Sequence, residues 1–250
     1  MQISIVIVEY YSLDDVLLCI SSVISNMKNY NYEFVVSSNS LYSEVKKKEL
    51  ETKYSYIKWV FNEKNGGFAY AMNKGLAITK GDILVIMNPD IQVVCGVERM
   101  IQYLDLHKNI GAIAPQIIND KGIVQDSYRH YMTVTSFVIR HLKRLFSKTD
   151  ILEKRSSSSM EIRTVDWVIG AFIMVKREVY EITHGLDEHY FLYCEDMDWC
   201  TRIRQSGYEI VYYPLAQIIY EGTRSARKSI KYSIIFINSL IRYWRKFGFF

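Results

Sequence analysis

The chain has 250 residues, of which 49% are hydrophobic and 23% are charged, so it is long enough for one packed domain and is not a disordered chain. Its first residues lack the basic segment and cleavage site of a signal peptide. No uncharged apolar stretch approaches the roughly 20 residues of a membrane-spanning helix. We therefore expect a cytoplasmic protein, whose four cysteines, lacking metal-ligand spacing, are reduced thiols.

The charge is distributed unevenly along the chain. The net charge is +4, yet residues 223–250 alone contain seven basic residues and no acidic one, so residues 1–222 are net acidic. A nucleic-acid-binding domain would spread its basic residues over the binding face. The sequence therefore predicts no nucleic-acid partner and a local basic surface near the end of the chain.

The first half of the chain alternates between two hydrophobic patterns. Short β-branched apolar runs predict strands, and apolar residues at helical spacing predict helices, the first of them after Ser12 as N-cap. The expected strands are residues 2–8, 32–36, 57–61 and 83–87, and the expected helices are residues 13–27, 45–53 and 67–79. This alternation predicts an α/β fold with a largely parallel sheet covered on both faces.

The second half is less regular. Residues 134–146 fit either a helix or a mobile segment, and the serine run within residues 147–163 predicts a flexible loop. The other expected elements are helices at residues 96–107 and 195–205 and strands at residues 110–118, 165–176 and 209–213, the last stopped by Pro214. No internal repeat or linker divides the chain.

Polar or glycine-rich residues follow each of the first four expected strands. These residues are Glu9, Ser37 and Ser38, the stretch 62–75, and the stretch 88–90. Any one of them fits ordinary loop chemistry. Because ligands bind beyond the carboxyl ends of parallel strands, the four together predict a cleft of nucleotide size.

Two of these segments have a specific chemistry. Asn65, Gly66 and Gly67 open a helix, so their backbone N–H groups can meet a phosphate or sugar oxygen, although such turns are often plain connections. Asp90 follows Asn88 at the end of an apolar strand, where a carboxylate can hold a divalent cation that bridges a diphosphate. An ordinary N-P-D turn explains Asp90 equally well.

The densest acidic cluster lies at the start of the expected helix 195–205. Glu195, Asp196 and Asp198 occupy its first turn, where the helix dipole favours carboxylates. Bulky apolar neighbours also make this a place to present a general base to a cleft. The residues alone leave capping and catalysis open.

Taken in order, these segments resemble the family 2 glycosyltransferases of the GT-A fold, above all the bacterial rhamnosyltransferase-like branch. The similarity covers roughly residues 2–222, and its most specific part is GLDEHYFLYCEDMDWCTRIRQSGYEIVYYP at residues 185–214. The other matching segments are residues 4–12, 35–40, 65–75, 83–93 and 165–179.

The resemblance implies a metal-dependent, inverting transfer of a sugar from a nucleoside-diphosphate sugar to a glycan or lipid-linked acceptor in bacterial surface polysaccharide synthesis. Asp196 would be the catalytic base and Asp90 would bind Mg²⁺ or Mn²⁺. The acceptor side would comprise Trp167, Gly170, Ala171 and Glu195. The donor side would comprise Glu9, Ser37, Ser38, Asn65, Gly67, Asn73, Asn88, Asp90 and Arg224.

Three positions depart from the family pattern. Where this chain has Glu9, the family usually has Asn. Where it has Ser37, the family has an Asp that binds the nucleobase, and where it has Tyr220, the family has His. Ser37 offers the base only a neutral hydrogen bond. Tyr220 cannot ligate a metal as the imidazole of histidine does, although Arg224 can take the place of that histidine as a phosphate partner. The alternative is therefore a catalytically weak or inactive homologue that acts as a binding or assembly partner.

Residues 1–222 form the expected catalytic domain, and residues 223–250 form a basic amphipathic segment. At 100° per residue its basic residues fall within a sector of about 100°, with apolar residues on the rest of the helix. The basic residues are Lys228, Lys231, Arg242, Arg245 and Lys246, and the apolar ones are Ile230, Phe236, Ile237, Leu240, Ile241, Trp244 and Phe247. This pattern suits peripheral contact with an anionic membrane at the cytosolic face of the inner membrane, or a helix packed on the domain.

Overall fold

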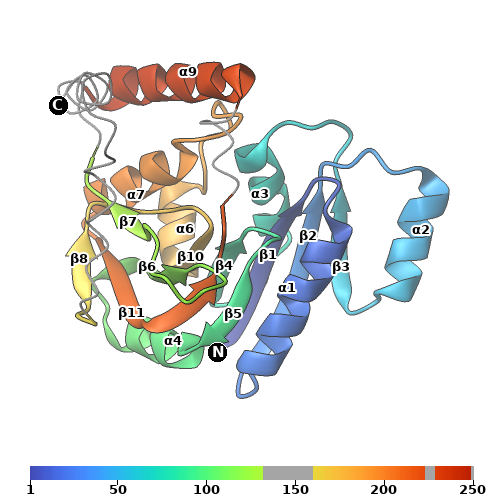
Figure 1. Ribbon diagram of the computed structural model, residues 1–250, viewed down its shortest axis with the longest axis horizontal. Helices are drawn as coiled ribbons and strands as arrows, with labels where there is room; N and C mark the ends of the chain where they lie inside the picture. The colour runs from blue at the N-terminus through green and yellow to red at the C-terminus, as the bar shows by residue number, and fades with distance from the viewer. Residues whose placement is uncertain (132–159, 223–228, 249–250) are drawn as a thin grey trace.

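A computed structural model describes residues 1–131, 160–222 and 229–248 of the chain. The first half consists of β1 (Gln2–Glu9), α1 (Leu13–Asn26), β2 (Asn31–Ser38), α2 (Glu44–Lys53), β3 (Ile57–Phe61), α3 (Phe68–Leu76) and β4 (Ile83–Met87). The second half consists of β5 (Gln92–Cys95), α4 (Val97–Leu106), β6 (Ile110–Ile118), β7 (Tyr128–Arg129), β8 (Arg163–Val165), β9 (Trp167–Val168), β10 (Phe172–Lys176), α6 (Arg177–Thr183), α7 (Glu195–Gln205), β11 (Glu209–Ile219) and α9 (Ile230–Phe247). The predicted α/β fold is confirmed (Figure 1).

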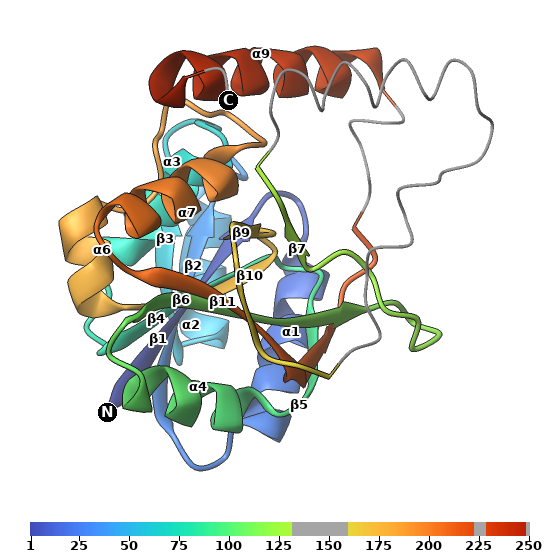
Figure 2. The same cartoon turned by 90° about the vertical axis from the view of Figure 1, so that its left-hand side faces the viewer.

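The central sheet has the strand order β3-β2-β1-β4-β10-β6-β11-β5, with β8 paired to β11. Strands β3, β2, β1 and β4 are parallel, as are β6 and β11, whereas β10 runs antiparallel to both of its neighbours. The carboxyl ends of β1 to β4 therefore meet at one edge, as the sequence predicted. This end of the molecule also carries α9 (Figures 1 and 2).

Both faces of the sheet are buried, which explains why its strands are continuous apolar runs. On one face Ile3, Ile5 and Ile7 of β1 pack in a core with α1 and α4. On the other face Val6 and Val8 join a second core with α3, α6 and α7. The period-two alternation of a strand thus feeds two separate cores from one segment.

Two strand predictions were wrong. Residues 165–176 were expected to form one strand, but the chain leaves β9 at Val168 and enters β10 at Phe172, because the N–H of Gly170 bonds to Asp196 instead of a strand. Strand β11 does not stop at Pro214 but continues to Ile219. A register shift after Tyr213 leaves an irregularity where proline, which has no N–H, is tolerated.

Other predictions agree closely. The strands at residues 57–61, 83–87 and 110–118 and the helix at residues 195–205 have the expected bounds. Strand β5 and helix α6 were missed, because each is short. Residues 134–146 and most of the expected loop 147–163 lie outside the described residues. All four cysteines are free thiols, and no helix in the described ranges has the length and hydropathy of a membrane span.

Polar contacts fix helix α9 to α7 and to the loop between α6 and α7. The hydroxyls of Tyr243 and Thr201 are 2.8 Å apart, and Ser239 Oγ donates to the carbonyl of Leu192 at 2.9 Å. Lys246 Nζ lies 2.7 Å from Oδ2 of Asp187 and 2.7 Å from Oδ2 of the fully buried Asp198. Helix α9 thus packs on the domain, and Lys246 does not belong to a free basic strip.

Candidate active site

The carboxylate of Glu9 is fully buried at the end of β1 and is surrounded by donors. Oε2 accepts a hydrogen bond from Ser38 Oγ, and Oε1 accepts from Ser40 Oγ at 3.0 Å and from the hydroxyl of Tyr42 at 3.1 Å. The backbone N–H of Ser12 also donates to Oε1, at 3.0 Å. Glu9 and Ser38 therefore organise the loops that follow β1 and β2, and their predicted contact with the donor stays a prediction.

A second chain of hydrogen bonds joins β2 and β3 to α3. Asn62 Nδ2 donates to Ser37 Oγ at 3.0 Å and to Asn39 Oδ1 at 3.1 Å. Asn39 Nδ2 in turn donates to the carbonyl of Gly67 at 3.1 Å, and Asn65 Oδ1 accepts from the N–H of Gly67. The predicted residues Ser37, Asn65 and Gly67 thus belong to one network, in which the amide of Asn62 binds the Ser37 hydroxyl.

Gly67 is glycine for a steric reason. Its φ is +94°, and a Cβ at this position would lie 2.2 Å from the carbonyl oxygen of Phe191. The same carbonyl accepts a hydrogen bond from the N–H of Phe68 at 3.0 Å, where α3 begins. This close approach brings the start of α3 against the loop that leads into α7.

Asn88, Asp90 and Tyr220 lie together at the end of β4. Asn88 Nδ2 donates to the hydroxyl of Tyr220 at 3.0 Å, while Asp90 is exposed to solvent. Burial raises the pKa of Tyr220 to about 12, and the negative charges of Asp90 and Asp196 add to this effect. Although Asp90 is exposed as a residue, partial shielding of its carboxyl group from water raises its pKa; a backbone hydrogen bond opposes the rise and the charge of Asp15 adds to it. Tyr220 therefore lies within electrostatic range of both carboxylates, at the position where the resemblance implies histidine.

Asp196 is held at the start of α7 by two backbone donors. Its Oδ2 accepts from the N–H of Gly170 at 2.8 Å and its Oδ1 accepts from the N–H of Met197 at 2.8 Å. Burial raises its pKa, whereas these hydrogen bonds and the positive charge of Arg129 oppose the rise. A fixed carboxylate with a raised pKa is suited to general-base catalysis near neutral pH.

Glu195, beside Asp196, differs from it in its surroundings. Its side chain is buried, and Oε2 has no hydrogen-bond partner among the described residues. Burial and the charge of Asp196 both raise the pKa of Glu195. A protonated Glu195 can donate a hydrogen bond, which is a different role from that of Asp196.

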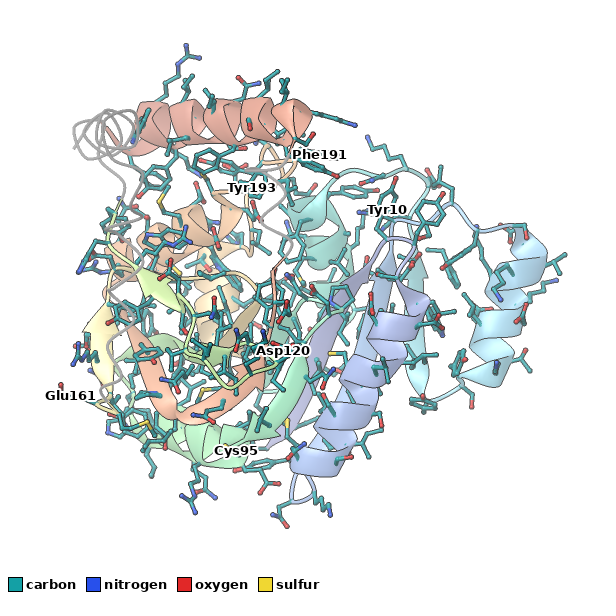
Figure 3. The ribbon with its side chains drawn as sticks, viewed as in Figure 1. Tyr10, Cys95, Asp120, Glu161, Phe191 and Tyr193 are labelled. Atoms are coloured by element: carbon teal, nitrogen blue, oxygen red, sulfur yellow. The ribbon has the colours of Figure 1, made fainter. Side chains whose placement is uncertain are left out.

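A pocket of about 160 Å³ opens at these two carboxylates. Its wall includes Glu195, Asp196, Trp167, Tyr193, Phe236 and Leu240. Tyr193 lies below α9, and its ring meets that of Phe236 edge to face, with centroids 5.9 Å apart (Figure 3). The structure thus brings the predicted acceptor-side residue Trp167 together with the predicted base.

The remaining predicted residues have identifiable surroundings. Gly170 packs against Asp196, and the carbonyl of Ala171 accepts a hydrogen bond from the N–H of Asn88 at 2.8 Å, so the turn between β9 and β10 connects the two carboxylate sites. The side chain of Asn73 bonds to Leu186 and to Glu188, which indicates that it positions a loop. Arg224 lies outside the described residues.

Several residues of this site were not identified from the sequence. Arg129 of β7 and the α9 residues Phe236 and Leu240 line the pocket, although each is far from Asp196 in the chain. Asn62 was present in a polar segment but had no pattern that separates it from a turn residue. An unusual run of polar side chains at the end of β3 was its only signal.

The chain is similar to several known glycosyltransferases. The family model described as "Glycosyl transferase family 2" matches residues 4–201. The chain is 25% identical over 214 residues to the low-salt glycan biosynthesis hexosyltransferase Agl10 of Haloferax volcanii, covering 84% of this chain and 64% of the relative. It is 27% identical over 150 residues to the N-acetylglucosaminyl-diphospho-decaprenol L-rhamnosyltransferase of Mycobacterium tuberculosis, covering 58% of this chain and 48% of the relative.

The chain thus spans between about half and two thirds of the length of these relatives. Among solved structures, the crystal structure of GalNAc-T7 with UDP, GalNAc and Mn²⁺ superposes with a TM-score of 0.65 at 16% identity. That match covers 88% of this chain and 44% of the other, and it shows a shared fold. The chain has the GT-A fold and belongs to glycosyltransferase family 2.

Proposed function

We propose that the chain transfers a sugar from a nucleoside-diphosphate sugar to an acceptor hydroxyl, with inversion at the anomeric carbon. The observation that carries this proposal is the position of Asp196. Two backbone N–H groups fix it at the pocket, and Tyr220 lies in the electrostatic field of both Asp196 and Asp90. In this proposal Asp196 serves the acceptor and Asp90 serves the donor.

In the proposed reaction Asp196 takes the proton from the acceptor hydroxyl. The acceptor oxygen forms a bond to the anomeric carbon while the bond from that carbon to the diphosphate breaks, and the diphosphate leaves with the electron pair. Glu195, protonated because its pKa is raised, donates a hydrogen bond that orients the acceptor. Burial of the pocket under Phe236 and Leu240 limits access of water to the reacting carbon.

A divalent cation fits the donor side. No group of three or more His, Cys, Asp or Glu suited to a metal is found in the described part of the chain, so the protein would supply one carboxylate, Asp90, with the amide oxygen of Asn88. This matches Mg²⁺, which is commonly held by one or two carboxylates together with substrate phosphates, and Mn²⁺ takes the same ligands. When bound, the cation would neutralise charge on the diphosphate.

The acceptor is proposed to be a glycan or a lipid-linked sugar in surface polysaccharide synthesis. The mycobacterial relative is named for a diphospho-decaprenol substrate and the archaeal relative for glycan biosynthesis, which supports this class. A lipid-linked acceptor would place the enzyme in the cytoplasm, at the cytosolic face of the inner membrane.

The donor is identified by a thermal-shift screen of nucleoside diphosphates and their sugars, with and without Mn²⁺. A tight ligand raises the apparent stability with the logarithm of its concentration, so the correct diphosphate should raise the melting temperature only when the cation is present. No response to any nucleotide would contradict the proposal. A response without subsequent transfer to any glycan or lipid-linked acceptor would identify a binding protein.

A further inference from the structure

Helix α9 carries a line of isoleucines on its outer face. Ile230, Ile234, Ile237 and Ile241 are 82%, 54%, 45% and 36% exposed, respectively. At 100° per residue, these four side chains fall within about 60° of the helix circumference. The sequence had grouped Ile230, Ile237 and Ile241 with Phe236, Leu240 and Trp244 on one apolar face, whereas the structure separates this isoleucine stripe from the buried face.

Basic residues lie along one side of the isoleucine stripe. Lys231, Arg242 and Arg245 are exposed and occupy the next sector of about 60°. Lys246 is excluded from this sector because Asp187 and Asp198 hold it against the domain. The helix contains no acidic residue, so nothing on α9 itself neutralises this basic border.

The inner face of the same helix forms part of the pocket. Phe236 and Leu240 line it beside Asp196, and Ser239 and Tyr243 anchor the helix to the domain. The isoleucine stripe is therefore held outward by fixed contacts. In both views α9 lies at the outer edge of the molecule, at the end where the carboxyl end of β1 lies (Figures 1 and 2).

We propose that the outer face of α9 binds the surface of an anionic lipid bilayer. The isoleucine side chains would enter the boundary between headgroups and acyl chains, and Lys231, Arg242 and Arg245 would contact the anionic headgroups. A second copy of this chain fits less well, because like charges on the two basic borders would meet.

The outer face of α9 also bears on how the enzyme would reach its acceptor, and this link rests on the proposed function. A helix is about 10 Å across, so a bilayer on the outer face of α9 would lie about that far from the pocket on its inner face. The headgroup sugar of a lipid-linked acceptor could then reach Asp196 without leaving the bilayer. The binding itself requires no catalysis and can be tested separately.

The test is flotation of the full chain with vesicles, without donor or acceptor, at low and high salt. Wild-type protein should float with vesicles of phosphatidylcholine and phosphatidylglycerol and bind much less to phosphatidylcholine alone, and salt should weaken the binding. Ile234→Ser with Ile237→Ser should reduce binding to anionic vesicles about tenfold or more. The matched control is Ile78→Ser with Ile182→Ser, because these isoleucines are 42% and 53% exposed elsewhere, and it should bind as wild type.

A second pair of variants tests the charges and does not alter the isoleucines. Lys231→Gln with Arg245→Gln should reduce binding to anionic vesicles, whereas Lys48→Gln with Lys121→Gln, which removes two exposed charges elsewhere, should not.

The proposal is overturned if wild type fails to float with anionic vesicles or if the serine pair on α9 floats unchanged. Dimerisation that is abolished by the serine pair, with no flotation, would assign the stripe to a second copy. Vesicle binding by a protein that never transfers sugar would refute the proposed function and leave the proposed membrane-binding surface in place.

Discussion

The backbone N–H of Gly170 donates a hydrogen bond to Asp196 Oδ2 at 2.8 Å across 26 positions of sequence. A Cβ at Gly170 would lie 3.0 Å from Cβ of Asp196, so the absence of a side chain permits this approach. The bond interrupts the single strand that the sequence predicted for residues 165–176. It also aims the carboxylate into the pocket, and thus one contact explains both a local irregularity of the sheet and the geometry of the proposed base.

Asp90→Ala is expected to weaken diphosphate binding only in the presence of a divalent cation, because Asp90 is the carboxylate at the end of β4 that is available to a metal. Titration calorimetry with the diphosphate found by the thermal-shift screen, with and without Mn²⁺, measures this effect. We expect a loss of about tenfold or more with the cation. Asp14→Asn is the control on the exposed start of α1. Equal affinity of wild type and Asp90→Ala in Mn²⁺ would remove Asp90 from the site.

Glu195→Gln is expected to stabilise the fold at high pH. The folded-state pKa of Glu195 is raised by burial and by the charge of Asp196, so its contribution to stability is fully present below the unfolded pKa and is lost as the pH rises through the folded pKa. Gln remains neutral throughout. Melting temperatures of variant and wild type should therefore agree near pH 4.5 and diverge as the pH rises, the variant melting higher. Glu63→Gln, on an exposed loop, should show no such divergence, and a constant offset for Glu195→Gln would contradict the expected protonation.

Ser37→Asp is expected to destabilise the protein whether or not Glu9 is replaced. The pairing of β1 with β2 joins Glu9 to Ser38, so the buried side chain at position 37 points to the opposite face of the sheet from Glu9. Burying a carboxylate there without a cation costs roughly 2–4 kcal/mol in the free energy of unfolding. Glu9→Asn together with Ser37→Asp should therefore not recover this loss. A double-mutant cycle by urea unfolding measures the coupling between the two positions, and a large coupling energy would contradict their placement on opposite faces.

Lys246→Gln is expected to reduce the free energy of unfolding by about 1–3 kcal/mol, because it leaves the buried Asp198 with Arg202 as its remaining basic partner. Burial alone would raise the pKa of Asp187, but hydrogen bonds from Lys246 and His189 outweigh burial and lower it. This carboxylate therefore contributes stability above its unfolded pKa that is lost as the pH falls, and the effect of the variant should shrink in acid. Urea unfolding at pH 7 and at about pH 2.5, below the unfolded pKa of Asp187, checks both points. Arg245→Gln, on the exposed face, is the neutral control, and an equally stable Lys246→Gln would mean that these ion pairs add nothing.

The sequence predicted elements where local periodicity decides the structure. Residues 57–61 and 83–87 are apolar runs between turns, and their bounds agree with β3 and β4. The same reasoning located the carboxyl ends of the first four strands, because parallel strands bring those ends together. The fold and the edge of the sheet at which these four segments meet were thus predictable from one sequence.

The failures concern contacts between distant segments. Nothing near Gly170 indicates that its N–H bonds to Asp196, and nothing near Lys246 indicates that it pairs with Asp187, 59 positions away. Helical periodicity described α9 correctly but could not decide which apolar residues face the domain. That choice depends on the shape of the surface formed by α7 and the loop before it.

Asp196 is proposed to be the base of the sugar transfer, and the transfer rate of Asp196→Asn with the identified donor and acceptor tests this role. The amide keeps the shape of the side chain and one oxygen that can accept from Gly170, but its NH2 group cannot accept from the N–H of Met197. The variant should therefore fold with a small loss of stability and bind donor as wild type does, while turnover falls by about 10²-fold or more. Asp120→Asn, an exposed change elsewhere, should transfer normally. Full transfer by a folded Asp196→Asn protein would show that Asp196 is not the base.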